Sequence, residues 1–229
     1  MAESLIGDLG IERGSLVAVV GAGGKTTVCL RLVDDAIVRG WKAVFTTTTR
    51  IGVDQHGGHA VAAAAEAAKT VERNGVCVVG TPSGTEKLAG PGVDWIEGAR
   101  DLFDLTVVEA DGARGMRAKA PMPHEPVVPP SADLVVSVIA ADALDRVIED
   151  ACHRPLRVAS VVGAGPYDRL TPERAARLLT SADGGRKNVP RRYAVVINKV
   201  DEFESERVAR LVELLGEVRV VMMPYEDRR

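Results

Sequence analysis

The sequence predicts an α/β fold in which a mostly parallel sheet carries helices on both faces. Short, almost wholly apolar runs alternate with helical patterns along the chain. Strands that are apolar throughout are typical of a sheet buried on both faces, and alternation with helices is typical of parallel pairing. A glycine-rich stretch also follows the first apolar run, at the strand end where such sheets bind their ligands.

The predicted elements follow from the spacing of the apolar residues. β-Branched runs predict strands, and apolar residues three and four apart predict helices. The predicted strands are 16–20, 43–47, 76–79, 105–109, 134–139, 193–197 and 218–221, and the predicted helices are 26–39, 60–73, 172–181 and 205–215. Residues 112–131 are rich in proline and contain no clear element, which is typical of a functional or disordered loop. We therefore expect one domain over residues 1–229, with a functional proline-rich loop at 112–131.

The composition limits the classes of partner. The chain has 229 residues, of which 46% are hydrophobic and 27% charged, and its formal net charge is −3. Without a block of lysines and arginines, this composition favours neither nucleic acid nor an anionic membrane as a partner. No apolar run reaches the ~18 residues of a membrane span, and the first residues lack the pattern of a secretory signal. Three widely spaced cysteines indicate reduced thiols, so we expect a cytoplasmic protein.

The glycine-rich stretch at 21–27 allows two interpretations. A dinucleotide fingerprint, G-x-G-x-x-G, would need a glycine where Thr26 stands and an acid after the second strand, where threonines stand. A phosphate loop explains more, because Lys25 would neutralise phosphate charge, Thr26 would offer a hydroxyl to Mg²⁺, and backbone N–H groups would bind phosphate oxygens. The short G-x-x-G-K-T spacing resembles the loop of the Mur ligases. We expect a nucleoside triphosphate to bind at Gly21, Ala22, Gly23, Gly24, Lys25, Thr26 and Thr27.

An acidic pair follows the buried run at 105–109. Glu109 or Asp111 would hold Mg²⁺, directly or through water, as the second-strand acid of a phosphate-loop enzyme does. Together with Lys25, these acids are the predicted catalytic residues, and the pattern does not say which of them faces the metal. An ordinary acidic strand end is the alternative explanation.

A second motif, Asn198-Lys199-Val200-Asp201, follows the buried run at 193–197. An N-K-x-D after a strand resembles the guanine-recognition motif of GTPases. Asp201 would accept from the guanine N1–H and 2-amino groups, Asn198 would brace the loop, and the stem of Lys199 would lie on the base. Because adenine lacks that donor pair, the motif favours GTP over ATP.

Two further polar segments are candidates for the site. Four threonines end the second predicted strand, and Thr48 is a candidate ligand for Mg²⁺ or a γ-phosphate, although the β-propensity of threonine also explains the run. In the proline-rich loop, the backbone is stiff enough to hold polar groups at little entropic cost. A substrate or anion site there would use Arg114, Lys119, His124 and Glu125, and a plain polar connector is the alternative.

Taken together, these motifs resemble the YqeC family. The resemblance rests on VGAGGKTT at 20–27, TTTTRI at 46–51, VEADGARG at 108–115 with KAPMPHEPVVP at 119–129, HRP at 153–155 and INKVD at 197–201. It implies a phosphate-loop nucleotide-binding protein that serves as an accessory of selenium-dependent molybdenum hydroxylases, in maturation of their selenium cofactor. The implied protein partner is a molybdenum hydroxylase or a cofactor-maturation enzyme. No settled reaction comes with the resemblance.

The motifs lead to one favoured function and two alternatives. We expect a Mg²⁺-dependent nucleoside triphosphatase that prefers GTP, with ATP as the other candidate nucleotide. An ATP-dependent ligase or kinase is the first alternative, supported by the Mur-like loop spacing. A non-catalytic accessory or carrier protein gated by nucleotide is the second, with 112–131 as its mobile element.

Overall fold

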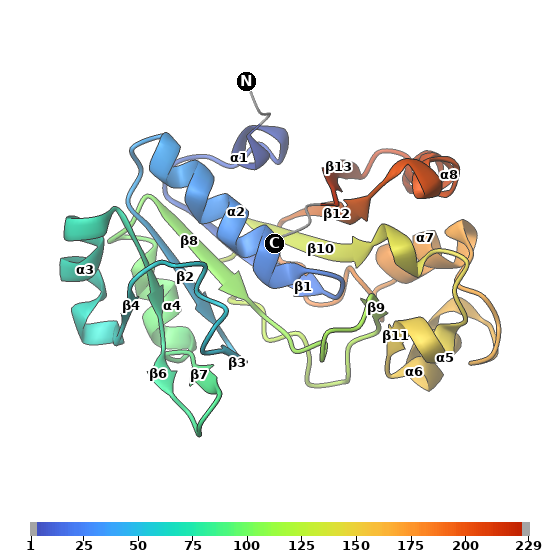
Figure 1. Ribbon diagram of the computed structural model, residues 1–229, viewed down its shortest axis with the longest axis horizontal. Helices are drawn as coiled ribbons and strands as arrows, with labels where there is room; N and C mark the ends of the chain where they lie inside the picture. The colour runs from blue at the N-terminus through green and yellow to red at the C-terminus, as the bar shows by residue number, and fades with distance from the viewer. Residues whose placement is uncertain (1–3, 226–229) are drawn as a thin grey trace.

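A central eight-stranded sheet organises the computed structural model, which describes residues 4–225 (Figure 1). Its strand order is β13-β12-β10-β1-β8-β2-β5-β4, and the paired strands all run parallel. The strands are β1 (Ser15–Gly21), β2 (Ala43–Thr47), β4 (Val61–Ala62), β5 (Val76–Val79), β8 (Leu105–Glu109), β10 (Leu134–Ala140), β12 (Arg192–Val200) and β13 (Arg219–Pro224). The predicted parallel α/β architecture is confirmed.

Helices cover both faces of this sheet. Alternate residues of β1 show the division: Val17 and Val19 pack in the core cluster that includes helices α1 and α2, whereas Leu16 and Ala18 pack with Ile96 of α4 on the other face. The same face as α4 carries further helices over the two wings of the sheet. The helices are α1 (Leu5–Asp8), α2 (Lys25–Val38), α3 (Ala67–Asn74), α4 (Val93–Ala99), α5 (Ile148–Ala151), α6 (Pro155–Val162), α7 (Pro172–Thr180) and α8 (Ser205–Leu215).

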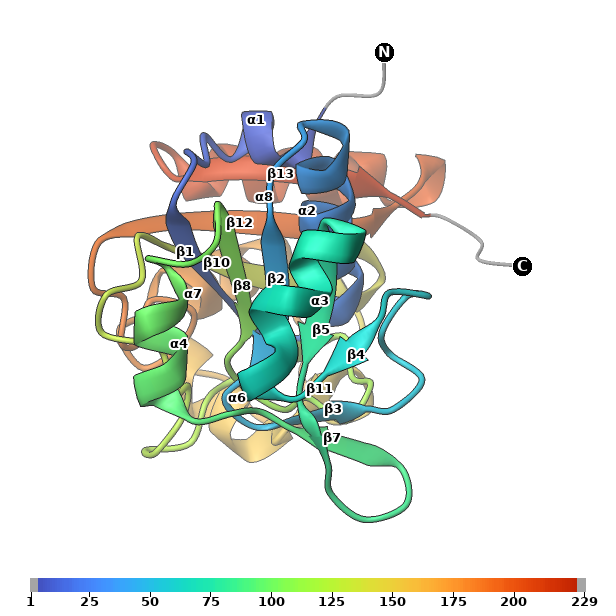
Figure 2. The same cartoon turned by 90° about the vertical axis from the view of Figure 1, so that its left-hand side faces the viewer.

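Two small sheets lie outside the central one. An antiparallel sheet is formed by β3 (Arg50–Gly52), β7 (Lys87–Ala89) and β6 (Thr81–Pro82), and its hairpin projects from the molecule in Figure 2. A parallel pair joins β9 (Ala118–Lys119) to β11 (Cys152–His153). Short 3-10 turns complete the fold as η1 (Ala64–Glu66), η2 (Ala141–Ala143) and η3 (Glu202–Glu204). The pair β9–β11 ties the proline-rich loop to the chain that precedes α6.

The predicted helix at 60–73 is wrong in its first half. Val61 and Ala62 instead form the edge strand β4, where they pair with Val78 and Val79 of β5. Pairing with an otherwise open sheet edge outweighs the helical preference of an alanine-rich stretch. The helix α3 begins only at Ala67. The three cysteines are buried and free, and none of the helices within residues 4–225 combines the length and apolar character needed to cross a bilayer.

Helix α2 offers a matched test of the core. We expect Leu32→Ala to lower the free energy of unfolding by about 2–5 kcal/mol, because Leu32 is fully buried against the sheet and its loss leaves a cavity. Val38→Ala on the same helix should change it by less than about 0.5 kcal/mol, because Val38 is 87% exposed. Urea denaturation of both variants measures this, and equal effects would contradict the observed packing of α2.

Candidate functional site

The glycine-rich loop connects β1 directly to α2. Gly21, Gly23 and Gly24 have φ angles of 93°, 89° and 118°, a region that side-chain-bearing residues rarely adopt. A Cβ on Gly23 would lie 2.4 Å from the backbone nitrogen of Ala140, so the close packing of the loop also requires glycine. Helix α2 begins at Lys25 without a side-chain cap, which leaves its first N–H groups available to an anion.

Lys25 is buried beneath this loop beside two carboxylates. Its Nζ donates to the Gly21 carbonyl at 3.0 Å and lies 3.6 Å from Glu109 Oε1 and 3.4 Å from Asp111 Oδ1. Burial alone would lower the pKa of Lys25, but Asp111 and Glu109 outweigh it and raise the pKa above its ordinary value. The lysine is therefore held as a cation at the start of α2.

Glu109 and Thr26 form a pair of oxygen groups at the start of α2. Parallel pairing sets Glu109 at the end of β8 beside Val19 of β1, and the Thr26 hydroxyl donates to Glu109 Oε2 at 2.8 Å. Burial raises the pKa of Glu109, with Lys25 and Thr26 opposing that effect. A hydroxyl and a carboxylate are ligands that suit Mg²⁺, which takes its other ligands from phosphates and water. No cluster of three metal-ligating acids, histidines or cysteines occurs among the described residues.

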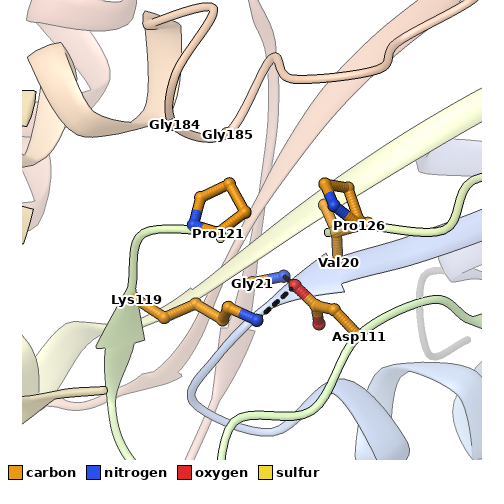
Figure 3. Close-up of a pocket in the computed structure, with 8 residues that line it drawn as sticks. All are labelled: Val20, Gly21, Asp111, Lys119, Pro121, Pro126, Gly184 and Gly185. Atoms are coloured by element: carbon orange, nitrogen blue, oxygen red, sulfur yellow. Dashed lines mark hydrogen bonds and ion pairs between the residues drawn. The ribbon is translucent and has the colours of Figure 1, made fainter. Parts of the chain in front are cut away.

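Asp111 connects the glycine loop to the proline-rich loop (Figure 3). Its Oδ2 accepts from the Gly21 N–H at 3.1 Å and lies 2.9 Å from Lys119 Nζ. Lys119 in turn contacts Glu125 at 3.1 Å, and Arg154 donates to both carboxylate oxygens of Glu125. Burial opposes ionisation of Glu125, but Arg154 and Lys119 outweigh it and lower the pKa of Glu125 to about 2. Opposite charges therefore alternate along one chain of contacts.

This arrangement separates the four residues predicted for a substrate or anion site. Lys119 and Glu125 pair with each other, and Lys119 lines a small cavity with Asp111, Pro121 and Pro126 (Figure 3). His124 is exposed on the loop. Arg114 instead lines a larger cleft beside the glycine loop. The structure thus brings only part of the predicted set together.

That larger cleft has a volume of about 570 Å³, within the range typical of small-molecule sites. One side is formed by the glycine loop and the start of α2, together with Glu109. The small antiparallel sheet and its connection supply Arg50, Gln55 and Lys87, which were not predicted as site residues. Arg50 directly follows the threonine run, but Lys87 has no motif around it that could have indicated a site. The remaining lining residues are 112–116 and Lys199.

Three side chains of the threonine run donate hydrogen bonds to backbone carbonyls and do not line this cleft. Thr46 donates to the carbonyl of Val79, and Thr47 donates to the carbonyl of Glu109. Thr48, the predicted metal ligand, donates to the carbonyl of Val127 at 3.0 Å and is not among the described residues that line the cleft. Its observed contact holds the proline-rich loop against β2.

The N-K-x-D motif meets the glycine loop at the end of β12. Asn198 is buried, and its Nδ2 donates to the Gly23 carbonyl at 2.9 Å. Lys199 has a φ of 59° and lines the cleft. Asp201 is exposed just beyond the strand, where its Oδ1 accepts from the Phe203 N–H at 2.9 Å. Two of the three motif residues are therefore in contact with the loop or the cleft.

Comparison with solved structures supports the fold that the loop predicts. The MinC:MinD cell division protein complex of Aquifex aeolicus is 15% identical, with a TM-score of 0.51 over 93% of this chain and 83% of that chain. At this identity the likeness concerns the fold alone. With the strand, glycine loop and helix at 15–38, the fold is P-loop NTPase-like, as the glycine-rich stretch predicts.

Sequence comparisons identify the family. A family model described as YqeC protein matches residues 17–156. The uncharacterized protein YqeC of Escherichia coli (strain K12) is 30% identical over 212 residues, which cover 88% of this chain and 83% of that protein. These matches confirm the predicted family and show that the chain belongs to the YqeC family.

Proposed function

We propose that this chain binds a nucleoside triphosphate with Mg²⁺ at the glycine loop and hydrolyses it, with GTP preferred to ATP. One observation carries the proposal: Lys25, Thr26 and Glu109 converge at the uncapped start of α2. A cation, an oxygen pair suited to Mg²⁺ and a helix N-terminus are the groups that a triphosphate requires. The side of the adjoining cleft that the glycine loop lines supplies the space for the nucleotide.

Each of these groups has a distinct role in the proposed reaction. Lys25 and the loop N–H groups stabilise negative charge on the transferring phosphoryl group. Thr26 and Glu109 would hold Mg²⁺, which would supply positive charge to the phosphates. Water attacks the γ-phosphorus, and the bond from that phosphorus to the β–γ bridging oxygen breaks, which yields inorganic phosphate and the diphosphate. Asp111, already bound to Lys119 and the Gly21 N–H, positions the loop.

The preference for GTP rests on the N-K-x-D motif. The bond from Asn198 to Gly23 joins the motif to the phosphate loop, which supports a base site beside the phosphates. Lys199 reaches the cleft, and Asp201 follows two residues later. A carboxylate at that point would accept two hydrogen bonds from guanine and none from the corresponding edge of adenine.

The cellular setting comes from the family resemblance. We propose that nucleotide hydrolysis serves maturation of selenium-dependent molybdenum hydroxylases or of their cofactor. The protein partner would be such a hydroxylase or a cofactor-maturation enzyme. Co-purification of the chain with such an enzyme, in the presence of Mg²⁺ and a non-hydrolysable GTP analogue, is the measurement for this part of the proposal.

Replacement of Lys25 tests nucleotide binding itself. We expect Lys25→Ala to weaken binding of Mg²⁺–GTP about 10- to 100-fold, because a charge-assisted contact to phosphate is lost. Calorimetric titration measures the affinity, and urea denaturation shows whether the variant remains folded without the ammonium between Glu109 and Asp111. Lys69→Ala, which removes an exposed lysine on α3, is the control and should bind as the wild type does. Unchanged affinity in folded Lys25→Ala would refute the proposed site.

A second pair of variants identifies the acid that binds the metal. We expect Glu109→Gln to weaken Mg²⁺ binding to the nucleotide complex about tenfold or more, because the amide lacks the charge of the carboxylate. Asp111→Asn should retain the metal and instead loosen the contact with Lys119. Titration of Mg²⁺ into protein with GTP analogue gives both affinities. The reverse pattern would assign the metal to Asp111.

Asp201→Asn tests the choice of base. We expect it to lower affinity for GTP about 10- to 100-fold while affinity for ATP stays within about twofold, because only guanine offers the donor pair. Glu206→Gln, an exposed acid on the following helix, is the matched control. If the wild type binds ATP and GTP with equal affinity, and Asp201→Asn changes neither affinity, the ligase or kinase interpretation takes precedence over the GTPase interpretation.

A further inference from the structure

The cleft beside the glycine loop has an excess of positive charge. Its described lining contains five cationic side chains and one carboxylate, that of Glu109. Lys25 is the cation that has acidic partners, since it lies beside Glu109 and Asp111. The other four form no hydrogen bond or ion pair among the described residues, and they are Arg50, Lys87, Arg114 and Lys199. Uncompensated cations that face one cleft favour an anionic ligand there.

Unpaired arginines are a minority among the described residues, and two of them line this cleft. Most described arginines donate to a carboxylate or a backbone carbonyl, as Arg100 does to Asp133, Arg154 to Glu125 and Arg177 to the carbonyl of Val162. Arg50 and Arg114 depart from this pattern within the same cleft. A planar guanidinium is suited to two oxygens of a phosphate, which makes these two side chains suitable ligands for that group.

The small antiparallel sheet fixes two of these cations on one face. Arg50 of β3 pairs with Ala89 of β7, and Lys87 lies two residues before Ala89, so both cations belong to the same side of the sheet. Diagonal neighbours of this kind have Cα atoms roughly 7–8 Å apart. On the opposite side, the paired residues Ile51 and Leu88 are buried and anchor the sheet to the core.

The sheet is also held firmly against the end of β2. A Cβ on Gly90, which follows β7, would lie 1.6 Å from the carbonyl oxygen of Thr47, so only glycine allows this approach. Val53 donates to the carbonyl of Glu86, which extends the contact between the two segments. The cationic face therefore forms one wall of the cleft that the glycine loop also lines.

We propose that Arg50 and Lys87, with Arg114, bind a second ligand: a small molecule that carries a phosphate group and lies beside the nucleotide. Lys25, the loop N–H groups and Mg²⁺ account for the triphosphate, so the cationic wall remains for a further anion. A phosphate carries a charge of −1.5 to −2 at neutral pH and several acceptor oxygens, which suits cations from separate segments. The proposal rests on the proposed function only for the position of the nucleotide.

The test is titration of inorganic phosphate into protein saturated with Mg²⁺ and a non-hydrolysable GTP analogue, at low ionic strength because salt screens exposed charges. We expect phosphate to bind the wild type. Arg50→Ala and Lys87→Ala should each weaken that binding about tenfold and change affinity for the analogue less than about twofold. Arg50→Lys should recover part of the loss. Lys69→Ala, which removes an exposed lysine on α3, is the control.

Two results would overturn this proposal. One is the failure of phosphate to bind the saturated wild type. The other is that the Arg50 and Lys87 variants weaken binding of the analogue as much as Lys25→Ala does, which would assign these cations to the nucleotide's own phosphates. If the analogue does not bind at all, phosphate is titrated into the protein alone. Binding that depends on Arg50 and Lys87 but not on Lys25 would then support the second site although the proposed nucleotide site had failed.

Discussion

Parallel pairing of β1 with β8 on one side and β10 on the other is the constraint on which the candidate site depends. The register sets Val19 beside Glu109, so the acid at the end of β8 reaches the lysine and threonine at the start of α2. On the other side, Gly21 pairs closely with Val138, and a Cβ on Gly21 would lie 2.4 Å from the carbonyl oxygen of Val138. A shift of one residue in either pairing would separate these groups, because successive strand residues face opposite sides.

The charges around this constraint form a continuous chain of alternating sign. It runs from Lys25 through Asp111, Lys119 and Glu125 to Arg154, and its members are largely removed from water. Burial of a charge costs free energy, and removal of one partner leaves the charge of the other uncompensated. Such a chain therefore favours one arrangement of the loops more than it adds to the stability of the fold as a whole. Its effect here is to join the glycine loop, the proline-rich loop and the segment before α6 into one unit.

The sequence allowed the central strands to be predicted closely, because their ends coincide with changes in residue chemistry. The apolar run of β8 ends at Glu109, and α8 begins and ends where expected. The choice between Glu109 and Asp111 could not be made, since it depends on the contacts of Thr26 and Lys119 across the fold. Arg50 and Lys87 were missed for a similar reason. Their common face exists only after β3 and β7 pair, and neither segment carries a motif for that pairing.

The position of Lys25 links metal binding to phosphate binding under the proposed function. Its ammonium faces two carboxylates and a backbone carbonyl, which satisfies its charge within the protein. Mg²⁺ at Glu109 would compete for one of those carboxylates, and the ammonium would then have more of its charge available to a phosphate. The phosphates would in turn supply oxygen ligands to the metal. Each ligand would thus raise the affinity of the site for the other. Because such coupling is reciprocal, the pair Lys25–Glu109 would make the proposed site respond to the metal–nucleotide complex rather than to either component.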